Sequence, residues 1–395
     1  MKKLRKNLIK PFITLVAILS VAINFNVFAS AETVYTNTKD TRIASTPTKD
    51  NRPSIGGFSI EKGINRMYVV KSNRENEVHA NFYYYPDINN PSKFAIFKLE
   101  NAGHANSMAF DNNYIYVSAW GKENKRSNII RIAKNTIKTM KFSQNREKID
   151  NYDILKTYYK TYNQSTKNYT YSLTTEISAI TNYNNSGTFI TRSTLPNGEK
   201  SSDYFIYSMA KIEKYDGKDA LIVERSENST FLVKDNFDEK GSLGQDIYYL
   251  PSNGSLYIPR WYKNRKCKNI IAWVHLKGSY SKVSINGFNY KCYTPDKINI
   301  NKTNQKSLGK KMYDKYEVES IAFTKNNDLL YSCNVDINEN YRVAYHNKYK
   351  NNPPADGIFK LTKSNGGKFI WLLKKIYYNK INQFVKKDQI YEKNN

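Results

Sequence analysis

The sequence has few cysteines, few acidic residues relative to basic ones, and no long apolar run after its N-terminal segment. Three cysteines in 395 residues exclude a dense disulfide framework. No later segment approaches the roughly eighteen apolar residues that a transmembrane helix requires, so we expect no membrane span in the mature chain. The GxSxG elbow, the P-loop, the dinucleotide fingerprint and HExxH are also missing, and we therefore expect no cofactor and no metal.

Residues 1–31 have the features of a secretory signal peptide. Five basic residues precede a mostly apolar, uncharged stretch over 11–23, and Ala29-Ser30-Ala31 fits the small-x-small cleavage pattern. The apolar stretch is too short to span a bilayer comfortably. We therefore expect the mature protein to be secreted, either extracellular or associated with the cell wall.

The chain is strongly basic, with 62 Lys and Arg against 35 Asp and Glu, and a formal net charge of +27. Removal of the signal takes away five basic residues, which leaves 27 − 5 = +22. Such a charge favours acidic partners, namely teichoic acid, anionic envelope polysaccharide or anionic lipid. Because the chain is expected to be exported, we do not expect it to bind nucleic acid. Scattered lysines on a solvated surface would give the same composition without any partner.

The cysteines leave one pairing open. Cys267 and Cys292 lie 25 residues apart (292 − 267) at the ends of what read as adjacent antiparallel strands. Export permits a disulfide between them, and antiparallel neighbours can bring two Cα atoms close enough. Cys333 lies in an apolar strand, where we expect a buried, inert thiol.

Between about residues 54 and 371 the sequence predicts β-structure throughout. Short runs of Tyr, Ile, Val and Thr alternate with Asn, Gly, Ser and Pro turns. Only 145–162 could hold a short helix. We expect a flexible leader over 32–52, one β domain over 53–375, and a basic C-terminal tail over 376–395.

Four stretches repeat one pattern, which is a polar residue, a short apolar strand, a turn, and a strand that bears Tyr or Phe. They begin at Asn106, Glu176, Gln245 and Glu319, at intervals of 70, 69 and 74 residues (176 − 106, 245 − 176, 319 − 245), and a weaker copy begins near Gly56. Each copy is accompanied by a third apolar strand; these strands span 94–99, 128–132, 204–207, 269–273 and 357–361. Repeated units of three or four strands predict an all-β fold, a five-bladed β-propeller.

In a propeller the first strand of each blade lines the central axis. The polar residues Asn106, Glu176, Gln245 and Glu319 would then lie at one level around that axis, where they form either a ligand site or a water-filled entrance. His104 immediately precedes one of these strands, and we expect it to face the site.

The ends of the second strands supply a second set of candidates. Lys71, Arg192 and Arg260 stand at equivalent positions, and cations beside carboxylates bind sugars through charge-assisted hydrogen bonds. Trp120 and Trp261 follow at matching positions and offer flat apolar faces for sugar stacking, or for ordinary packing between blades.

The same carboxylates permit a glycoside hydrolase. That reaction needs an acid and a base or nucleophile about 5 Å or about 6.5–9.5 Å apart. Glu176 and Glu319, with Asp246 beside them, are the catalytic candidates under this hypothesis.

Short motifs resemble the helveticin-J-like proteins, a family of large bacteriocins. The resemblance covers about residues 100–362 and rests on 103–110, 245–258, 317–321 and 343–347. It implies a secreted, cell-surface-directed antibacterial propeller and points to four site residues, which are His104, Glu317, Glu319 and His346. The chain departs from that family in its cleavable signal and its basic, Asn-rich composition.

Together these patterns favour a secreted protein that binds an envelope glycan or an anionic glycopolymer. A glycoside hydrolase and a protein–protein scaffold are the alternatives. The sequence does not indicate an oligomeric state.

Overall fold

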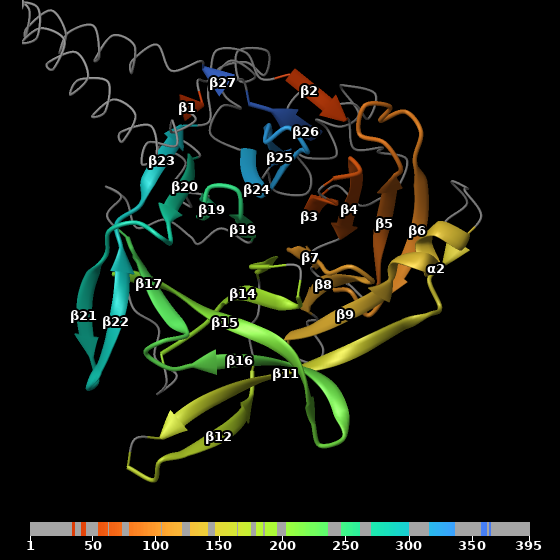
Figure 1. Ribbon diagram of the computed structural model, residues 1–395. Helices are drawn as coiled ribbons and strands as arrows, with labels where there is room; N and C mark the ends of the chain where they lie inside the picture. Colours follow the sequence, from red (N-terminus) through yellow and green to blue (C-terminus); the bar gives the residue numbers. More distant parts are fainter. Residues whose placement is uncertain are drawn as a thin grey trace, which may run out of the picture. The chain divides into compact units, whose positions relative to one another are not determined.

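The computed structural model describes residues 34–35, 41–44, 54–61, 63–72, 79–103, 105–120, 127–140, 147–163, 165–174, 179–184, 186–195, 203–235, 246–260, 270–299, 316–335, 357–361 and 363–364. Over these residues the chain is almost entirely β-structure (Figure 1). The one helix in this part of the chain, α2 (Lys134–Thr139), follows directly on a strand. The sequence prediction of an all-β protein is confirmed.

The chain divides into two compact units, 37–362 and the terminal segments 1–36 with 363–395. In the terminal unit the described residues form two short antiparallel strands, β1 (Val34–Tyr35) and β27 (Lys363–Ser364). All features below belong to the unit 37–362.

This unit contains five runs of four antiparallel strands, which we number sheets 1 to 5. Sheet 1 is β3 (Ser54–Glu61), β4 (Arg66–Ser72), β5 (His79–Tyr85) and β6 (Ala95–Glu100). Sheet 2 is β7 (Met108–Phe110), β8 (Tyr114–Trp120), β9 (Ser127–Ala133) and β11 (Tyr152–Asn163). Sheet 3 is β13 (Ile180–Asn182), β14 (Thr188–Arg192), β15 (Tyr204–Tyr215) and β17 (Thr230–Lys234).

The last two sheets follow the same order. Sheet 4 is β18 (Tyr248–Leu250), β19 (Ser255–Arg260), β20 (Ile270–His275) and β23 (Asp296–Asn299). Sheet 5 is β24 (Tyr316–Phe323), β25 (Leu329–Val335), β26 (Gly357–Lys360) and, from the other end of the unit, β2 (Thr41–Ala44).

The first strands of the five sheets contact one another in a closed cycle. β3 contacts β7, β7 contacts β13, β13 contacts β18, β18 contacts β24, and β24 contacts β3. Each sheet therefore has two neighbouring sheets, and the strands that begin the five sheets surround a common centre.

The hydrophobic core lies between neighbouring sheets. Tyr68 of sheet 1 and Ile115 of sheet 2 belong to one buried cluster, and similar clusters join sheets 2 and 3, sheets 3 and 4, and sheets 1 and 5. Sheets 4 and 5 meet where the rings of Tyr257 and Phe323 lie 4.7 Å apart. Both faces of most strands are thus covered, which explains why many strands are continuous apolar runs rather than alternating ones.

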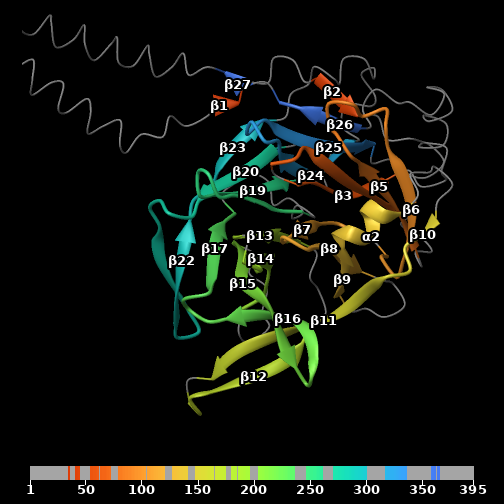
Figure 2. The ribbon, with the colours of Figure 1, turned by 45° about the vertical axis from the view of Figure 1, so that its right-hand side comes forward.

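Five further strands extend the sheets at their outer edges. β10 (Glu147–Lys148) pairs with β6, and the hairpin β21 (Ser281–Ile285) and β22 (Phe288–Tyr293) pairs with β17. β12 (Asn168–Leu173) and β16 (Lys218–Arg225) flank β11, and the parallel pairing of β11 with β16 joins sheets 2 and 3. Figures 1 and 2 both show the β11–β12 hairpin extending beyond the four-stranded sheets.

Three sequence expectations differ from the structure. Within the predicted flexible leader 32–52, residues 41–44 form β2, because their partner β26 lies more than 300 positions along the chain and is invisible to local composition (358 − 44). The stretch 145–162 contains a long strand instead of a helix. The strand over 94–99 is the fourth of its sheet, since the Tyr-rich β5 precedes it.

The described part of the chain contains no helix that is both long and apolar enough to cross a bilayer.

We predict that β2 stabilises the whole unit, because it is the outer strand of sheet 5 and Ile43 packs against the core between sheets 1 and 5. A chain that begins at Asp50 loses this strand and should be less stable by about 2 kcal/mol or more, from lost backbone hydrogen bonds and apolar burial. Urea unfolding measures the difference. A chain that begins at Asn37 retains β2 and is the matched control; equal midpoints for the two chains would contradict the prediction.

Candidate functional site

A hydrogen-bond network at the centre of the cycle contains one residue from each of the five sheets. Asp246, just before β18, accepts hydrogen bonds from the hydroxyls of Ser107 and Ser320. The Ser107 Oγ donates to the carbonyl of Ile180 at 2.9 Å, and the Ser320 Oγ donates to the carbonyl of Phe58 at 3.1 Å. Sheets 2 and 4 are not neighbours in the cycle, so the Asp246 carboxylate reaches across its centre.

The two serines are structurally equivalent. The backbone N–H of Ser107 donates to Ser118 Oγ at 3.0 Å, and that of Ser320 donates to Ser332 Oγ at 3.0 Å. Each serine oxygen also accepts a backbone N–H from the first strand of the next sheet, at 3.0 and 3.1 Å. The sequence repeat, which aligns Ser107 with Ser320, therefore corresponds to a repeated set of contacts.

The Asp246 carboxyl has a raised pKa of about 7, and burial in the interior is the largest cause. Hydrogen bonds from Ser107, Ser320 and the backbone oppose this effect. Each serine hydroxyl has a single proton but two acceptors within reach, a carbonyl and a carboxylate oxygen. Two donors are therefore missing for the two serines together, and a proton on Asp246 supplies one of them.

Two glycines let sheet 1 approach the centre closely. A Cβ atom on Gly56 would lie 1.9 Å from the carbonyl oxygen of Ala105, and one on Gly57 would lie 2.9 Å from the backbone of Asn106. The pairing of β3 with β4 shifts its register at this point, as expected for a β-bulge. Residues 105–107 can therefore pack directly on the backbone of β3.

Three polar side chains are buried around this bulge. Lys71 of β4 lies opposite Ile55, Asn106 precedes Ser107, and Glu319 precedes Ser320; their exposed fractions are 1%, 7% and 2%. The Oδ1 of Asn106 has no hydrogen-bond partner among the described residues. Lys71, Asn106 and Glu319 come from sheets 1, 2 and 5. These sheets are consecutive in the cycle, so the three buried polar side chains belong to one side of it.

Some of the other predicted site residues are described in the structure, and some lie outside the described residues. Arg192 is partly exposed at the end of β14. Arg260 and Trp120 end β19 and β8, but their side chains are not among those described. Five candidates lie outside the described residues: His104, Glu176, Gln245, Trp261 and His346.

Sequence reasoning missed the two serines of the network. It selected the polar residue that opens each copy, whereas the side chains that meet at the centre come from the next position, at Ser107, Asp246 and Ser320. The available signal was the identity of that second position in two of the copies, where a serine follows Asn106 and follows Glu319.

Cysteines and metal ligands add no site in the described residues. Cys292 is a free, buried thiol in β22, and its predicted partner, residue 267, lies outside the described residues. The described residues contain no group of three or more His, Cys, Asp or Glu that could hold a metal ion.

No family model and no curated protein match this chain. Solved structures with a remote likeness include a proposed 6-phosphogluconolactonase from Bacteroides uniformis, at 10% identity and a TM-score of 0.35, over 73% of this chain and 80% of that one. Another is the periplasmic gluconolactonase PpgL of Pseudomonas aeruginosa, at 7% identity and a TM-score of 0.34, over 70% and 77%. Likeness at this level does not carry a function from one protein to another.

We predict that Asp246 makes folding stability depend on pH. Its folded pKa of about 7 lies above the ordinary 3.8, so the folded state holds the proton more tightly than the unfolded state. The stabilisation from this group is complete below about pH 4 and is lost as the pH rises through about 7. In Asp246→Asn, which cannot titrate, this part of the pH dependence should vanish.

Urea unfolding of both proteins from pH 4 to pH 8 provides the measurement. The free energy of unfolding of the wild type should fall relative to that of the variant across this range. Asp216→Asn changes an exposed turn carboxylate and is the control, which should keep the wild-type pH dependence. A constant difference between wild type and Asp246→Asn at every pH would refute the role of Asp246.

Proposed function

We propose that this protein is an exported five-bladed β-propeller that binds an anionic glycopolymer of the bacterial envelope. The binding site lies at the end of the central axis where Asn106 and Asp246 precede β7 and β18 and where Glu319 lies in β24. Binding, rather than hydrolysis, is its activity.

Topology supports the propeller. Five runs of four antiparallel strands follow one another along the chain, within sheets of five, twelve, four and four strands, and the first strands of these runs contact each other in a cycle. β2 joins the last sheet and thereby ties the two ends of the cycle together. A sandwich of two sheets would bury two faces against each other and would not produce this cyclic order.

The observation that carries the binding proposal is that two basic sequence segments follow strands that end on the Asp246 side of sheet 4. Segment 261–269 follows β19, and segment 300–315 follows β23; the pairing of β18, β19, β20 and β23 puts both strand ends at the end of sheet 4 where Asp246 lies. The first segment has four basic residues and no acidic one, and the second has five basic residues and one acidic one. Their net charges of +4 and +4 favour a polyanion at this end.

Buried polar residues lie beneath the proposed site. Lys71, Asn106 and Glu319 put a cation, an amide and a carboxylate close to the axis, and because all three are almost fully buried they support the site from below. Asp246 is a poor catalytic acid in this reading, because both of its oxygens already accept hydrogen bonds from serines. It acts as a structural group beneath the site.

The test compares two charge-matched triple variants in binding soluble, purified wall teichoic acid. Lys263→Gln, Lys266→Gln and Lys268→Gln remove three charges from segment 261–269. Exposed charge contacts contribute about 0.5 kcal/mol each, so we expect about tenfold weaker binding by calorimetry. Added salt should weaken wild-type binding as well, because the contacts are screened.

The control variant carries Lys138→Gln, Lys277→Gln and Lys325→Gln, three exposed lysines at the opposite strand ends. It should bind within twofold of the wild type. Equal weakening of both variants would mean that only the overall charge matters, and absence of any teichoic acid binding would favour a scaffold. Release of new reducing ends from wall polysaccharide, abolished by Glu319→Gln, would establish the hydrolase instead.

A further inference from the structure

The strands β11, β12, β15 and β16 extend beyond the regular sheets and form an arm with its own outward face. Their order in the arm is β12, β11, β16, β15. The hairpin end of β11 and β12 lies at the bottom of both Figure 1 and Figure 2, away from the first strands. The cycle of first strands does not need this extension, so its sequence is free to serve another purpose.

The strand register separates the two faces of the arm. On β11, Leu155, Thr157 and Tyr159 are buried on the inner face, so Tyr158, Lys160 and their alternate neighbours lie on the outer face. Residues directly opposite in the register share a face. Among the residues of the outer face are six that we call the tyrosine face: Tyr158, Lys160, Tyr162, Tyr169, Tyr171 and Tyr215.

The five tyrosines form two groups of ring contacts on one face. Tyr215 lies with its ring centroid 4.4 Å from that of Tyr158 and 4.8 Å from that of Tyr171. Tyr162 and Tyr169 lie 5.2 Å apart, and the Lys160 Nζ lies 4.6 Å from the centre of the Tyr169 ring. These contacts hold the rings in fixed orientations, which lowers the entropy lost when a ligand binds.

The surface is nevertheless open to water. Tyr169 and Tyr171 are 46% and 39% exposed, and Ile154 on the same face is 47% exposed. These are three of the five large apolar side chains that are exposed in the described part of the chain. Tyr169 and Tyr171 are next to each other on one face of β12, and two neighbouring exposed rings are typical of a binding surface.

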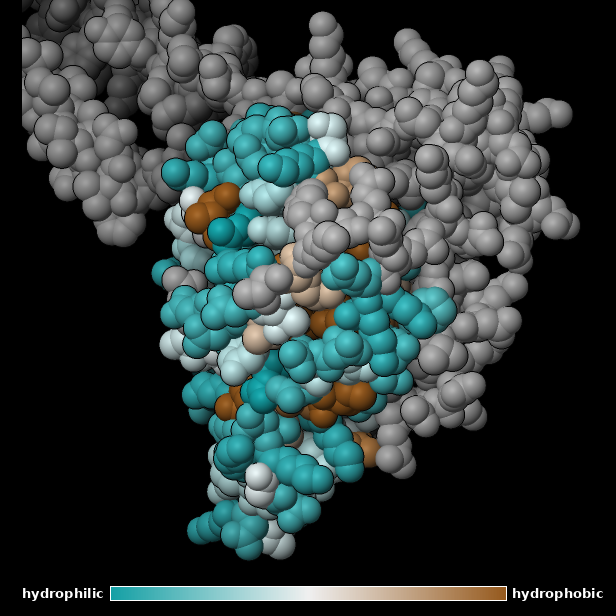
Figure 3. All heavy atoms as spheres, turned by 90° about the vertical axis from the view of Figure 1, so that its right-hand side faces the viewer, coloured by the Kyte–Doolittle hydropathy of each residue, from teal (hydrophilic) through white to brown (hydrophobic). Residues whose placement is uncertain are grey.

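The charges on this face select the kind of ligand. The lysines Lys156, Lys160, Lys211 and Lys218 face outward with two acidic residues, Glu213 and Glu224, which gives 4 − 2 = +2. The hydrophilic surface dominates the face of the molecule that Figure 3 shows. A lipid surface or an apolar protein partner would require a more hydrophobic face, whereas sugar rings stack on tyrosines and their acidic groups pair with lysines.

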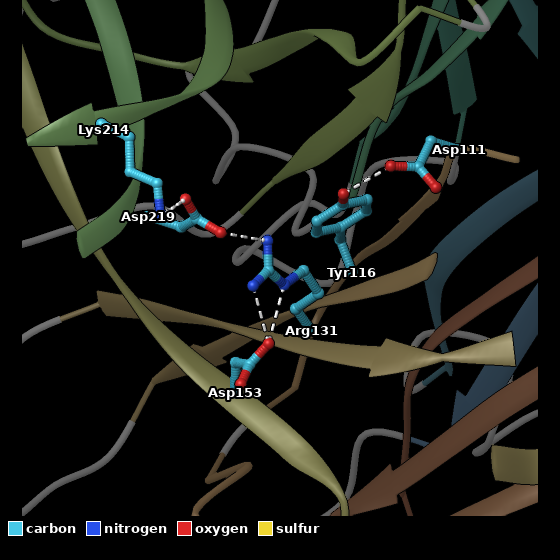
Figure 4. A network of polar contacts seen from close by, with 6 residues as sticks. All are labelled: Asp111, Tyr116, Arg131, Asp153, Lys214 and Asp219. Carbon is cyan, nitrogen blue, oxygen red and sulfur yellow. Dashed lines mark hydrogen bonds and ion pairs between the residues drawn. The ribbon is translucent and has the colours of Figure 1, made fainter. Parts of the chain in front are cut away.

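Ion pairs on the inner side fix the arm to the sheets (Figure 4). Arg131 of β9 donates to Asp153 of β11 at 2.7 Å and to Asp219 of β16 at 2.9 Å, and Lys214 of β15 pairs with Asp219 at 2.9 Å. This one guanidinium thus connects three strands. The arm is anchored at its base, so its outer face is a rigid platform.

We propose that the tyrosine face is a second binding surface, for a glycan chain of pyranose sugars that carry carboxylate groups. The sugar rings stack on Tyr158, Tyr169 and Tyr171, and the surrounding lysines pair with the carboxylates. This surface is separate from the axial site and does not depend on the proposed function there. A protein with both surfaces would bind two polymers of one envelope.

The experiment measures binding to insoluble peptidoglycan stripped of teichoic acid, a glycan with acidic substituents. Tyr169→Ser combined with Tyr171→Ser removes two exposed rings without touching the core, and binding should fall about tenfold. Tyr280→Ser is the control, because Tyr280 is also 46% exposed with a lysine over its ring at 5.2 Å, but it directly precedes β21, outside the arm. It should bind like the wild type.

Crossing the two sets of variants separates this proposal from the axial one. The double tyrosine variant should retain teichoic acid binding, and the triple variant in 261–269 should retain peptidoglycan binding. Equal behaviour of the double variant and Tyr280→Ser on peptidoglycan, or no binding of the wild type, would overturn the proposal. A single-stranded DNA oligonucleotide is tested in parallel, since its bases could stack in the same way; tighter binding of DNA, lost in the double variant, would also overturn it.

Discussion

The structure depends on a single buried carboxyl group. Asp246 joins Ser107 and Ser320, and through their hydroxyls it reaches Ile180 and Phe58, so all five sheets meet in one network. A buried carboxylate costs free energy unless hydrogen bonds or a proton compensate it. Here the hydrogen bonds from two serines offset part of that cost, and the remaining cost of burial raises the pKa of Asp246 to about 7. The centre is therefore polar yet closed, and the apolar clusters lie farther out, between the sheets.

A polar centre also explains the spacing of the first strands. Gly56 and Gly57 let the backbone of β3 touch residues 105–107, which brings Ser107 within reach of the centre. Sheet 5 reaches the same centre through Ser320, and β2 closes that sheet from the N-terminal side. The outer strand of sheet 5 thus comes from the N-terminal end of the unit, while its first strand supplies Ser320 to the central network.

The sequence predicted the strands better than it predicted the site. The repeat identified the first strands because apolar residues recur in the same order after Asn106 and after Glu319. It could not reveal β2, whose partner is remote, or the strand nature of 152–163, where buried Leu155 and Tyr159 alternate with exposed residues in a way that also tolerates a helix. Apart from Asp246, the residues chosen from the repeat lie one position before the side chains that meet at the centre. Neighbouring residues of a strand point to opposite faces, and the local sequence does not say which face is central.

The two proposed surfaces use the fold in different ways. The axial site gathers residues from several sheets, so its geometry follows from the closed cycle and from Asp246. The tyrosine face draws on two neighbouring sheets and is fixed mainly by Arg131 at its base. Because the arm lies outside the cycle, its exposed tyrosines can change without disturbing the central network. Independent surfaces on one rigid unit would let the protein engage two polymers at once, which strengthens binding beyond either contact alone when both lie within reach.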